Sequence, residues 1–125
     1  MRTVILRHTL PDGSWHHDWL VERADLALVP TWRTGHHRPD DPACVSFEAE
    51  RIGDHRAMYL DYEGEVSGGR GSVQRLATGT IIETDGGTRW GTDSIVLSAD
   101  FDGRVVGFVG RAVKGGLWRF RTMHG

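Results

Sequence analysis

The sequence predicts an all-β protein, a compact single-domain β-barrel of antiparallel strands with little or no helix, spanning residues 1–125. Seventeen glycines against only four prolines indicate many tight turns. Asp-Gly and Gly-Gly pairs recur between alternating segments at intervals of about 8–12 residues, which is typical of a sandwich or small barrel. A chain of 125 residues suits one modest core, and 38% hydrophobic with 26% charged residues favours folding over disorder.

The first two strands form a predicted hairpin. Residues 3–9 (TVILRHT) are rich in β-branched side chains, and residues 15–22 (WHHDWLVE) form the return strand. Between them, Pro11 and Asp12 suit the central positions of a type I turn, and Gly13 can adopt a positive φ. This pattern predicts a type I turn followed by a G1 bulge.

Three further strands are predicted in the middle of the chain. They cover residues 26–34, 44–52 and 56–66, with loops at 35–43 and 67–71. Pro30 cannot donate a backbone hydrogen bond, so the first of these strands should lie at an edge or contain a bulge. Residues 44–52 also fit a short helix, but we favour a strand.

The last third of the chain predicts a meander of four strands. The strands cover residues 72–84, 88–100, 104–113 and 117–123. They are separated by the turn sequences DGG, FDG and KGG. No helix, internal repeat, linker or second domain is indicated.

Composition limits the classes of function. Fifteen basic and 17 acidic residues give a net charge of −2, so any contact with nucleic acid should be local. Cys44 is the single cysteine, which excludes an intrachain disulfide and fits a reducing compartment. The first apolar run is too short for a signal peptide or a membrane span. We therefore expect a cytoplasmic protein without membrane contact.

Two histidines and an aspartate are predicted to meet on one face of the first hairpin. Side chains alternate along a strand, so His16, Asp18 and Leu20 share a face. If Leu10 pairs with Ser14 across the bulged turn, the register places His8 opposite His16. Cross-strand partners have Cβ atoms about 4.5–5.5 Å apart, so the two imidazoles and the carboxylate should converge.

Two imidazoles and a carboxylate suit a divalent metal. Imidazole favours Zn, Fe, Ni or Cu, whereas oxygen ligands make Mn or Mg accessible. The pair His16 and Asp18 supplies two ligands, and His55 is a candidate for the third. Tyr59 shares the face of His55 if that segment is extended. The competing interpretation is a polar pair on a solvated strand face.

The remaining conspicuous residues have simpler interpretations. His36 and His37 lie in a polar loop beside Arg38 and should be on the surface. His124 is almost at the C-terminus and should be disordered. The glycine-rich stretch at 67–71 is too short for a Walker-type phosphate loop. The five tryptophans should pack in the core or against hairpins.

Two stretches together resemble the phosphoesterase domain of bacterial DNA ligase D. That family has a histidine, a spacer and H-x-D-x-R on a strand, followed by D-H-x-x-x-Y, D-x-E-G and a glycine-rich turn. Here His8 matches the first histidine, and His16, His17 and Asp18 match the H-x-D element. The stretch DHRAMYLDYEGEVSGGRGSV, which starts at residue 54, matches the second element. TGT at 78–80 and WRFRTMHG near the end resemble later strands of the family.

The resemblance implies a stand-alone relative that acts in DNA end repair. The family removes 3′-terminal phosphates and ribonucleotides from DNA ends with manganese, on a compact β-barrel. By resemblance, His16, Asp18 and His55 would hold the metal. His8 and Tyr59 would contact or activate the scissile phosphate. Nicked or primer–template DNA 3′ ends, and a ligase or other end-joining protein, are the implied partners.

The sequence departs from the family at the arginine two residues after the aspartate, where it has Leu20. A leucine cannot supply the charged donors that bind phosphate. Arg33, Arg56 or Arg70 are the candidates to replace it, Arg33 and Arg70 first. The spacer between His8 and His16 is also longer than is usual in the family.

Three other functions therefore stay open. The first is an impaired relative that binds metal or nucleic-acid ends without turnover. The second is a non-haem iron oxygenase, since H-x-D…H is also a facial triad. The third is a structural β-barrel without a site.

Overall fold

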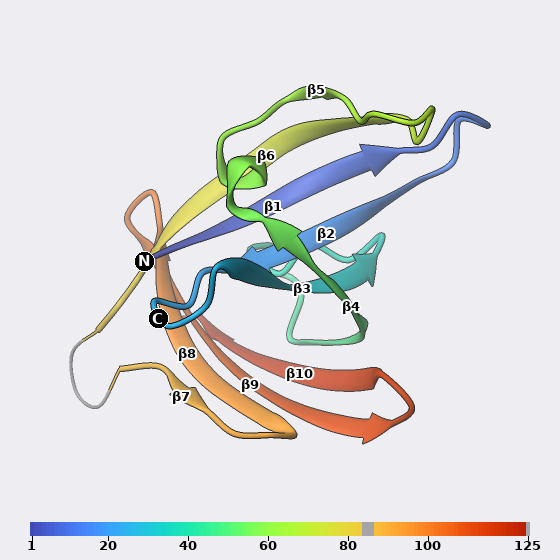
Figure 1. Cartoon of the computed structure of the whole chain (residues 1–125). Coiled ribbons are helices and arrows are strands. Elements are labelled where there is room, and N and C mark those ends of the chain that lie inside the picture. Colours follow the sequence, from blue (N-terminus) through green and yellow to red (C-terminus); the bar gives the residue numbers. More distant parts are fainter. Residues whose placement is uncertain (84–86, 125) are drawn as a thin grey trace.

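The strands of the protein form a single antiparallel sheet that closes on itself. The computed structural model describes residues 1–83 and 87–124. In this part of the chain the sheet order is β5-β6-β1-β2-β3-β4-β10-β9-β8-β7, and β6 also pairs with β8 (Figure 1). Eight strands, from β6 round to β8, thus form a ring, and the predicted all-β, antiparallel fold is confirmed. The strands are β1 (Arg2–Thr9), β2 (Trp15–Val21), β3 (Leu28–Gly35), β4 (Ser46–Arg56), β5 (Gly64–Glu65), β6 (Ser72–Ile81), β7 (Arg89–Trp90), β8 (Ser94–Phe101), β9 (Arg104–Lys114) and β10 (Leu117–His124).

The first hairpin forms in the predicted register. The amide of Leu10 donates to the carbonyl of Ser14 at 2.8 Å, and Gly13 has a φ of +89°. Only glycine adopts this φ without strain. As a result, His8 lies opposite His16 across β1 and β2.

Most of the other predicted strands are also present. Residues 44–52 belong to a strand, which continues as β4 to Arg56. The β3–β4 pairing shifts register between Val29 and Thr31, which confirms the irregularity expected at Pro30. His124 lies within β10 and its Nε2 is 3.2 Å from the carbonyl of Cys44, so the expectation of disorder there was wrong. The predicted DGG turn at 85–87 and the end of strand 72–84 reach residues outside the described ranges.

The segment 56–66 was wrongly predicted as a continuous strand. It contains the 3₁₀-helix η1 (Ala57–Leu60) and the short strand β5. Its apolar residues pack across the face of other strands rather than within the sheet, with Leu60 fully buried. Apolar alternation over a few residues does not distinguish these two arrangements.

The main core fills the inside of the ring. Trp19 and Trp32 are its largest residues, and the indole N–H of Trp19 donates to Thr3 Oγ1 at 2.8 Å. Every strand of the ring contributes to this cluster. Its buried members are Ile5, Trp19, Val21, Trp32, Phe47, Ala49, Ile81, Ile95, Leu97, Ala99, Phe101, Val106, Phe108, Trp118 and Phe120.

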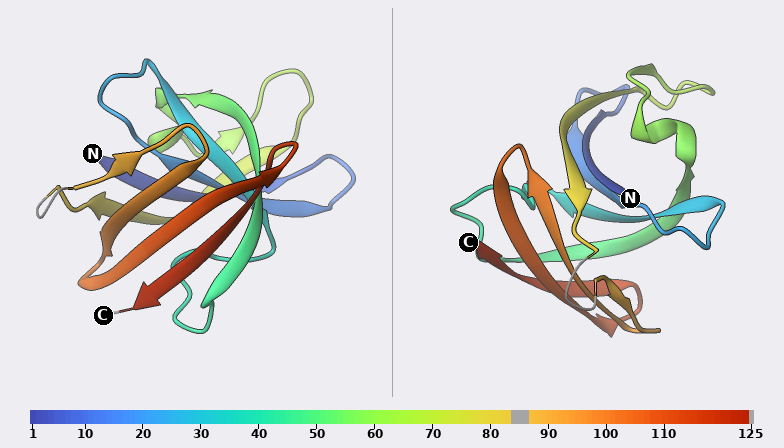
Figure 2. Two further views of the ribbon diagram at one scale, coloured as in Figure 1. Left: turned by 90° about the horizontal axis from the view of Figure 1, so that it is seen from below. Right: turned by 90° about the vertical axis from the view of Figure 1, so that its left-hand side faces the viewer.

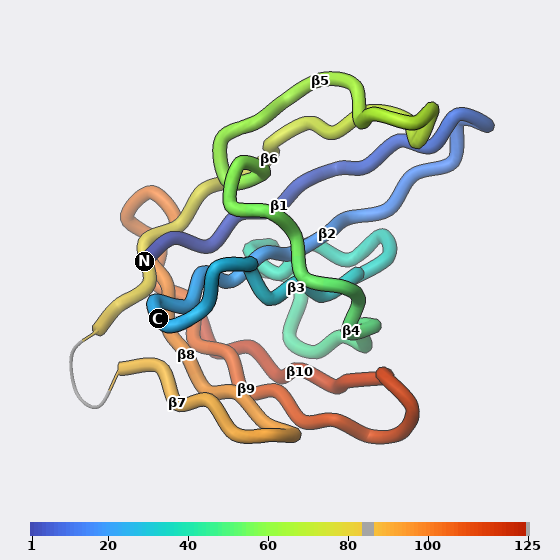
Figure 3. The backbone as a smooth tube through the Cα atoms, in the orientation of Figure 1, coloured from blue at the N-terminus to red at the C-terminus, as the bar shows by residue number. Residues whose placement is uncertain are grey.

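A second apolar cluster covers the opposite face of β1 and β2. Figure 2 shows the segment from β4 through η1 to β5 curving over this face. The tube in Figure 3 follows the chain from β5 back into β6, beside β1. We call this group the outer cluster: Val4, Leu6, Leu20, Val29, Leu60 and Val73, with Tyr59, Tyr62 and Val66 packed against it.

No helix in the part of the chain that the structure describes is long and apolar enough to cross a membrane.

Candidate metal centre

The β1–β2 hairpin brings His8, His16 and Asp18 together beside the outer cluster. His8 faces His16, and Asp18 pairs with Leu6 two residues further along. One ligand atom from each of the three side chains lies within 4.8 Å of the other two. The convergence that alternation and turn geometry predicted is therefore present. This group can hold a metal ion.

His55 approaches the same carboxylate from β4. Its Nε2 lies 3.7 Å from Asp18 Oδ2. The pairing of Val29 with His55 places this part of β4 next to β3. Both His16 and His55 of the predicted trio thus lie beside Asp18. The mutually close ligand atoms, however, belong to His8, His16 and Asp18, so His8, predicted to contact phosphate, stands in this set where His55 was expected.

Asp18 is the buried centre of the group. Its side chain is 2% exposed, and its oxygens lie 3.3 Å from His16 Nε2 and 3.9 Å from His8 Nδ1. Burial raises the pKa of this carboxyl, but interactions with His16 and His55 outweigh that effect and hold the pKa well below its usual range. Asp18 is therefore an ionised carboxylate away from bulk water, which requires positive charge or strong donors around it.

His16 carries a nitrogen without a hydrogen-bond partner. Its Nε2 is buried and is 3.3 Å from Asp18 Oδ1, but it makes no hydrogen bond to any described group. A buried polar atom left in this way costs about 1–3 kcal/mol. A metal ion bound beside Asp18 would use this nitrogen as a ligand.

Backbone carbonyls hold the far sides of the other two imidazoles. His55 Nδ1 is 3.2 Å from the carbonyl of Gly53, and His8 Nε2 is 2.7 Å from the carbonyl of Arg70. A carbonyl only accepts, so these nitrogens carry the hydrogen. In each ring, the nitrogen that faces Asp18 is then the one that can release its hydrogen and offer a lone pair to a metal ion. Metal-binding histidines usually donate in this way to a second group.

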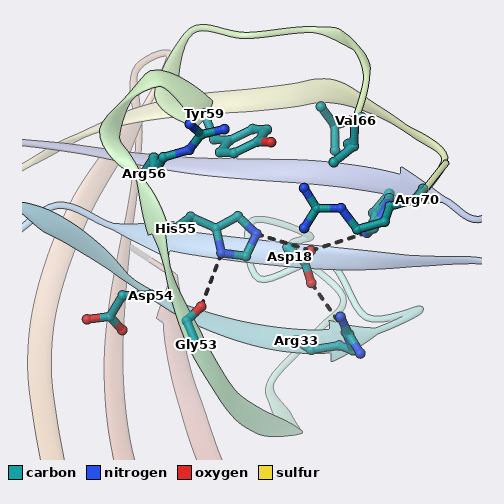
Figure 4. Close-up of a pocket in the computed structure, with 11 residues that line it drawn as sticks. Asp18, Arg33, Gly53, Asp54, His55, Arg56, Tyr59, Val66 and Arg70 are labelled. Atoms are coloured by element: carbon teal, nitrogen blue, oxygen red, sulfur yellow. Dashed lines mark hydrogen bonds and ion pairs between the residues drawn. The ribbon is translucent and has the colours of Figure 1, made fainter. Parts of the chain in front are cut away.

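The group opens into a pocket of about 420 Å³ (Figure 4). Arg33 and Arg70 lie on opposite sides of Asp18, and Tyr59 lies beside His55 with ring centroids 5.6 Å apart. The Nε of Arg33 is 3.5 Å from Asp18 Oδ1. The pocket is lined by His8, Asp18, Arg33, Gly53, Asp54, His55, Arg56, Tyr59, Val66, Arg70 and Val73.

Leu20 shares the face of His16 and Asp18 but does not reach the pocket. It pairs with Val4 and is fully buried in the outer cluster. The predicted face is therefore right. The side chain that stands where the resembling family has an arginine belongs to the support beneath the site and not to the pocket lining.

The other histidines lie outside this centre. His36 and His37 are exposed, as predicted, and the ring of His36 stacks on Trp15 with centroids 4.1 Å apart. His17 is on the opposite face of β2, where its Nδ1 donates to the carbonyl of His37. Burial is the main cause that lowers the pKa of His17, which favours its neutral form.

Sequence reasoning missed the backbone groups of the site. The carbonyls of Gly53 and Arg70 leave no trace in residue type. Val66 and Val73 were also missed, because an apolar wall has no distinct signal outside its fold. The basic pocket residues were named only as candidates, and the structure places Arg33, Arg56 and Arg70 around one cavity.

No protein-family model matches the chain, and no curated protein matches it.

The ionised state of Asp18 predicts a characteristic loss of stability in acid. Its pKa is lower in the folded state than its ordinary value of 3.8, so it stabilises the metal-free protein above that pH. This contribution is lost as the pH falls from about 4 towards the folded-state pKa. The difference in free energy of unfolding between wild type and Asp18→Asn should therefore shrink as the pH falls below about 4. Urea denaturation at several pH values measures it. A difference that is constant from neutral to strongly acidic pH would contradict this account.

Proposed function

We propose that the protein binds a divalent metal ion through His8, His16 and Asp18, with His55 beside them, and hydrolyses phosphate esters at DNA 3′ ends. The observation that carries the proposal is a pocket lined by His8, Asp18, His55 and three arginines, with the buried Nε2 of His16 beside Asp18. A metal ion and arginines are the usual means of binding and neutralising a phosphate.

The donor set favours a transition metal. Three imidazole nitrogens and one carboxylate suit Mn, Fe, Zn or Cu better than Mg or Ca. We propose Mn first, from the ligase D resemblance, and Zn second. The buried, unpartnered Nε2 of His16 supports a metal-ligand role for this residue. When bound, the metal would polarise a phosphoryl oxygen and neutralise developing charge.

The arginines would hold the phosphate for attack by water. Arg33 reaches the Asp18 carboxylate, and its side chain is 39% exposed, so its guanidinium is open to the pocket. Arg70 and Arg56 add two more positive groups at the rim. In the proposed reaction, water oxygen bonds to phosphorus, the ester bond to the sugar 3′ oxygen breaks, and the sugar oxygen gains a proton. Tyr59, which lines the pocket beside His55, would contact the phosphate or the terminal sugar.

A second candidate is a module of the same fold that binds metal or DNA ends without turnover. The burial of Leu20 favours it, because the donor found there in the resembling family is missing. A non-haem iron oxygenase has the same ligand types but does not account for three arginines in the pocket. The cytoplasmic location, the DNA substrate and a ligase partner are parts of the proposal that follow from the sequence.

The test is phosphate release from a 3′-phosphorylated primer annealed to a template, in the presence of Mn²⁺. Wild type should release phosphate, His16→Ala should not, and His36→Ala should behave as wild type because His36 is exposed and outside the pocket. Binding of the primer–template without phosphate release would favour the second candidate. Equal activity in His16→Ala and wild type would contradict the proposed site.

Removing one pocket arginine should slow the reaction. A hydrogen bond to a charged group contributes about 1.5–3 kcal/mol, so Arg33→Ala and Arg70→Ala should each lower kcat/KM by about 10- to 200-fold. Arg119→Ala is the matched control, since this exposed arginine pairs with Glu48 far from the pocket lining. The rates should be measured in the same Mn²⁺ assay. Unchanged rates in both variants would show that other groups bind the phosphate.

A further inference from the structure

The two ring nitrogens of His8 face oxygen atoms of two different groups. Its Nε2 lies 2.7 Å from the carbonyl oxygen of Arg70, and its Nδ1 lies 3.9 Å from Asp18 Oδ2. Because the carbonyl is an acceptor, this contact requires the hydrogen on Nε2. The lone pair of the neutral ring is then on Nδ1, the nitrogen that faces the candidate metal centre.

The position of that carbonyl depends on the glycine-rich loop. The Nε of Arg70 donates to the carbonyl of Ser67 at 2.7 Å, and the amide of Val66 donates to the carbonyl of Gly71 at 2.8 Å. These bonds fold the loop back on itself. Immediately after it, β6 pairs with the end of β1, where Val73 lies opposite His8.

Gly71 is the point at which the loop meets β1. Its φ is +93°, and a Cβ added there would lie 1.9 Å from the carbonyl oxygen of Thr9, the residue after His8. Any side chain would therefore force the loop and β1 apart. The approach of the Arg70 carbonyl to His8 depends on the absence of a side chain at this position.

We propose that the loop Ser67–Gly71 is a positioning element for the metal centre. It fixes the orientation and the tautomer of His8, so that Nδ1 is the ligating nitrogen, and Gly71 is the residue that permits it. This inference rests on the proposed metal binding. It gives the loop between β5 and β6 a role in orienting a metal ligand, in addition to connecting the two strands. Groups that orient a ligand in this way contribute about 10- to 100-fold to metal affinity.

The first test compares Gly71→Ala with Gly103→Ala. Gly103 also has a positive φ, +89°, but a Cβ there meets nothing within 4 Å. Binding of Zn²⁺ or Mn²⁺, measured by calorimetry, should weaken by about 10- to 100-fold in Gly71→Ala and stay unchanged in Gly103→Ala. A folded Gly71→Ala protein with wild-type affinity would overturn the proposal.

The second test reads the ring of His8 directly. In the metal-free wild type, nitrogen NMR should show His8 with its hydrogen on Nε2, and that proton should exchange slowly because the Arg70 carbonyl binds it. A ring with its hydrogen on Nδ1 and none on Nε2 would overturn the proposal. This measurement needs no metal, so it tests whether the loop fixes the tautomer of His8 separately from whether the protein binds metal. A wild type that binds no metal would contradict the proposed function, and the NMR result would still show whether the loop orients His8.

A pair of His8 variants covers the case in which Gly71→Ala fails to fold. The amide oxygen of asparagine lies close to the position of Nδ1, whereas that of glutamine lies close to Nε2. Metal affinity should therefore be higher in His8→Asn than in His8→Gln. Equal affinities, or the reverse order, would show that Nδ1 is not the ligating nitrogen.

Discussion

Replacing Asp18 with alanine should reduce the affinity of the protein for Mn²⁺ and Zn²⁺ by more than about 100-fold. Loss of a group that merely orients a metal ligand costs about 10- to 100-fold, and Asp18 would itself be a ligand. His8, His16 and His55 also all converge on its carboxylate. Without its charge, three imidazoles would remain without the anion that offsets a divalent cation. Calorimetric titration with each metal gives the measurement.

The matched control for this experiment is Asp25→Ala. Asp25 is an exposed carboxylate that pairs with Arg23 and lies outside the pocket. Its removal should leave metal affinity unchanged. If Asp18→Ala is folded and binds both metals as tightly as wild type, the centre described here is not a metal site. Loss of phosphate release without loss of metal binding would place Asp18 in the chemistry instead.

The hairpin was the most predictable part of the site. Pro11, Asp12 and Gly13 determine a turn of known geometry, and turn geometry determines the register of the strands that follow. The position of His8 opposite His16 is a direct consequence. Short-range rules of this kind need no knowledge of the remaining chain.

The remaining parts of the site depend on long-range packing. His55 reaches Asp18 because β4 pairs with β3, and spacing along the chain does not encode that pairing. The segment after His55 has the alternation of a strand, yet burial of Leu60 against the outer cluster selects a 3₁₀-helix instead. Tertiary contacts override weak local preferences in such short segments.

Leu20 shows how sequence and structure combine. Alternation places it correctly on the face of His16 and Asp18. The burial of the Leu20 side chain depends on η1, which covers this face and brings Leu60 into the outer cluster. A position that the ligase D resemblance would assign to phosphate binding is thus, in the folded chain, a fully buried part of the core.

Leu20→Arg should therefore unfold the protein rather than restore a phosphate-binding arginine. Leu20 is 0% exposed among apolar side chains, and a guanidinium without a partner in such a place costs several kcal/mol. Arginine is also larger than leucine, and overpacking a well-packed core costs about 1–3 kcal/mol more. A domain of this size has about 5–15 kcal/mol of total stability.

Leu20→Met, which conserves volume, should cost less than about 1.5 kcal/mol and serves as the control. Urea denaturation followed by tryptophan fluorescence measures all three proteins. A folded Leu20→Arg protein that releases phosphate faster than wild type would contradict this prediction. It would mean that the arginine leaves the outer cluster and reaches the pocket. It would also mean that the wild-type site lacks a phosphate-binding donor that Arg33 and Arg70 do not replace.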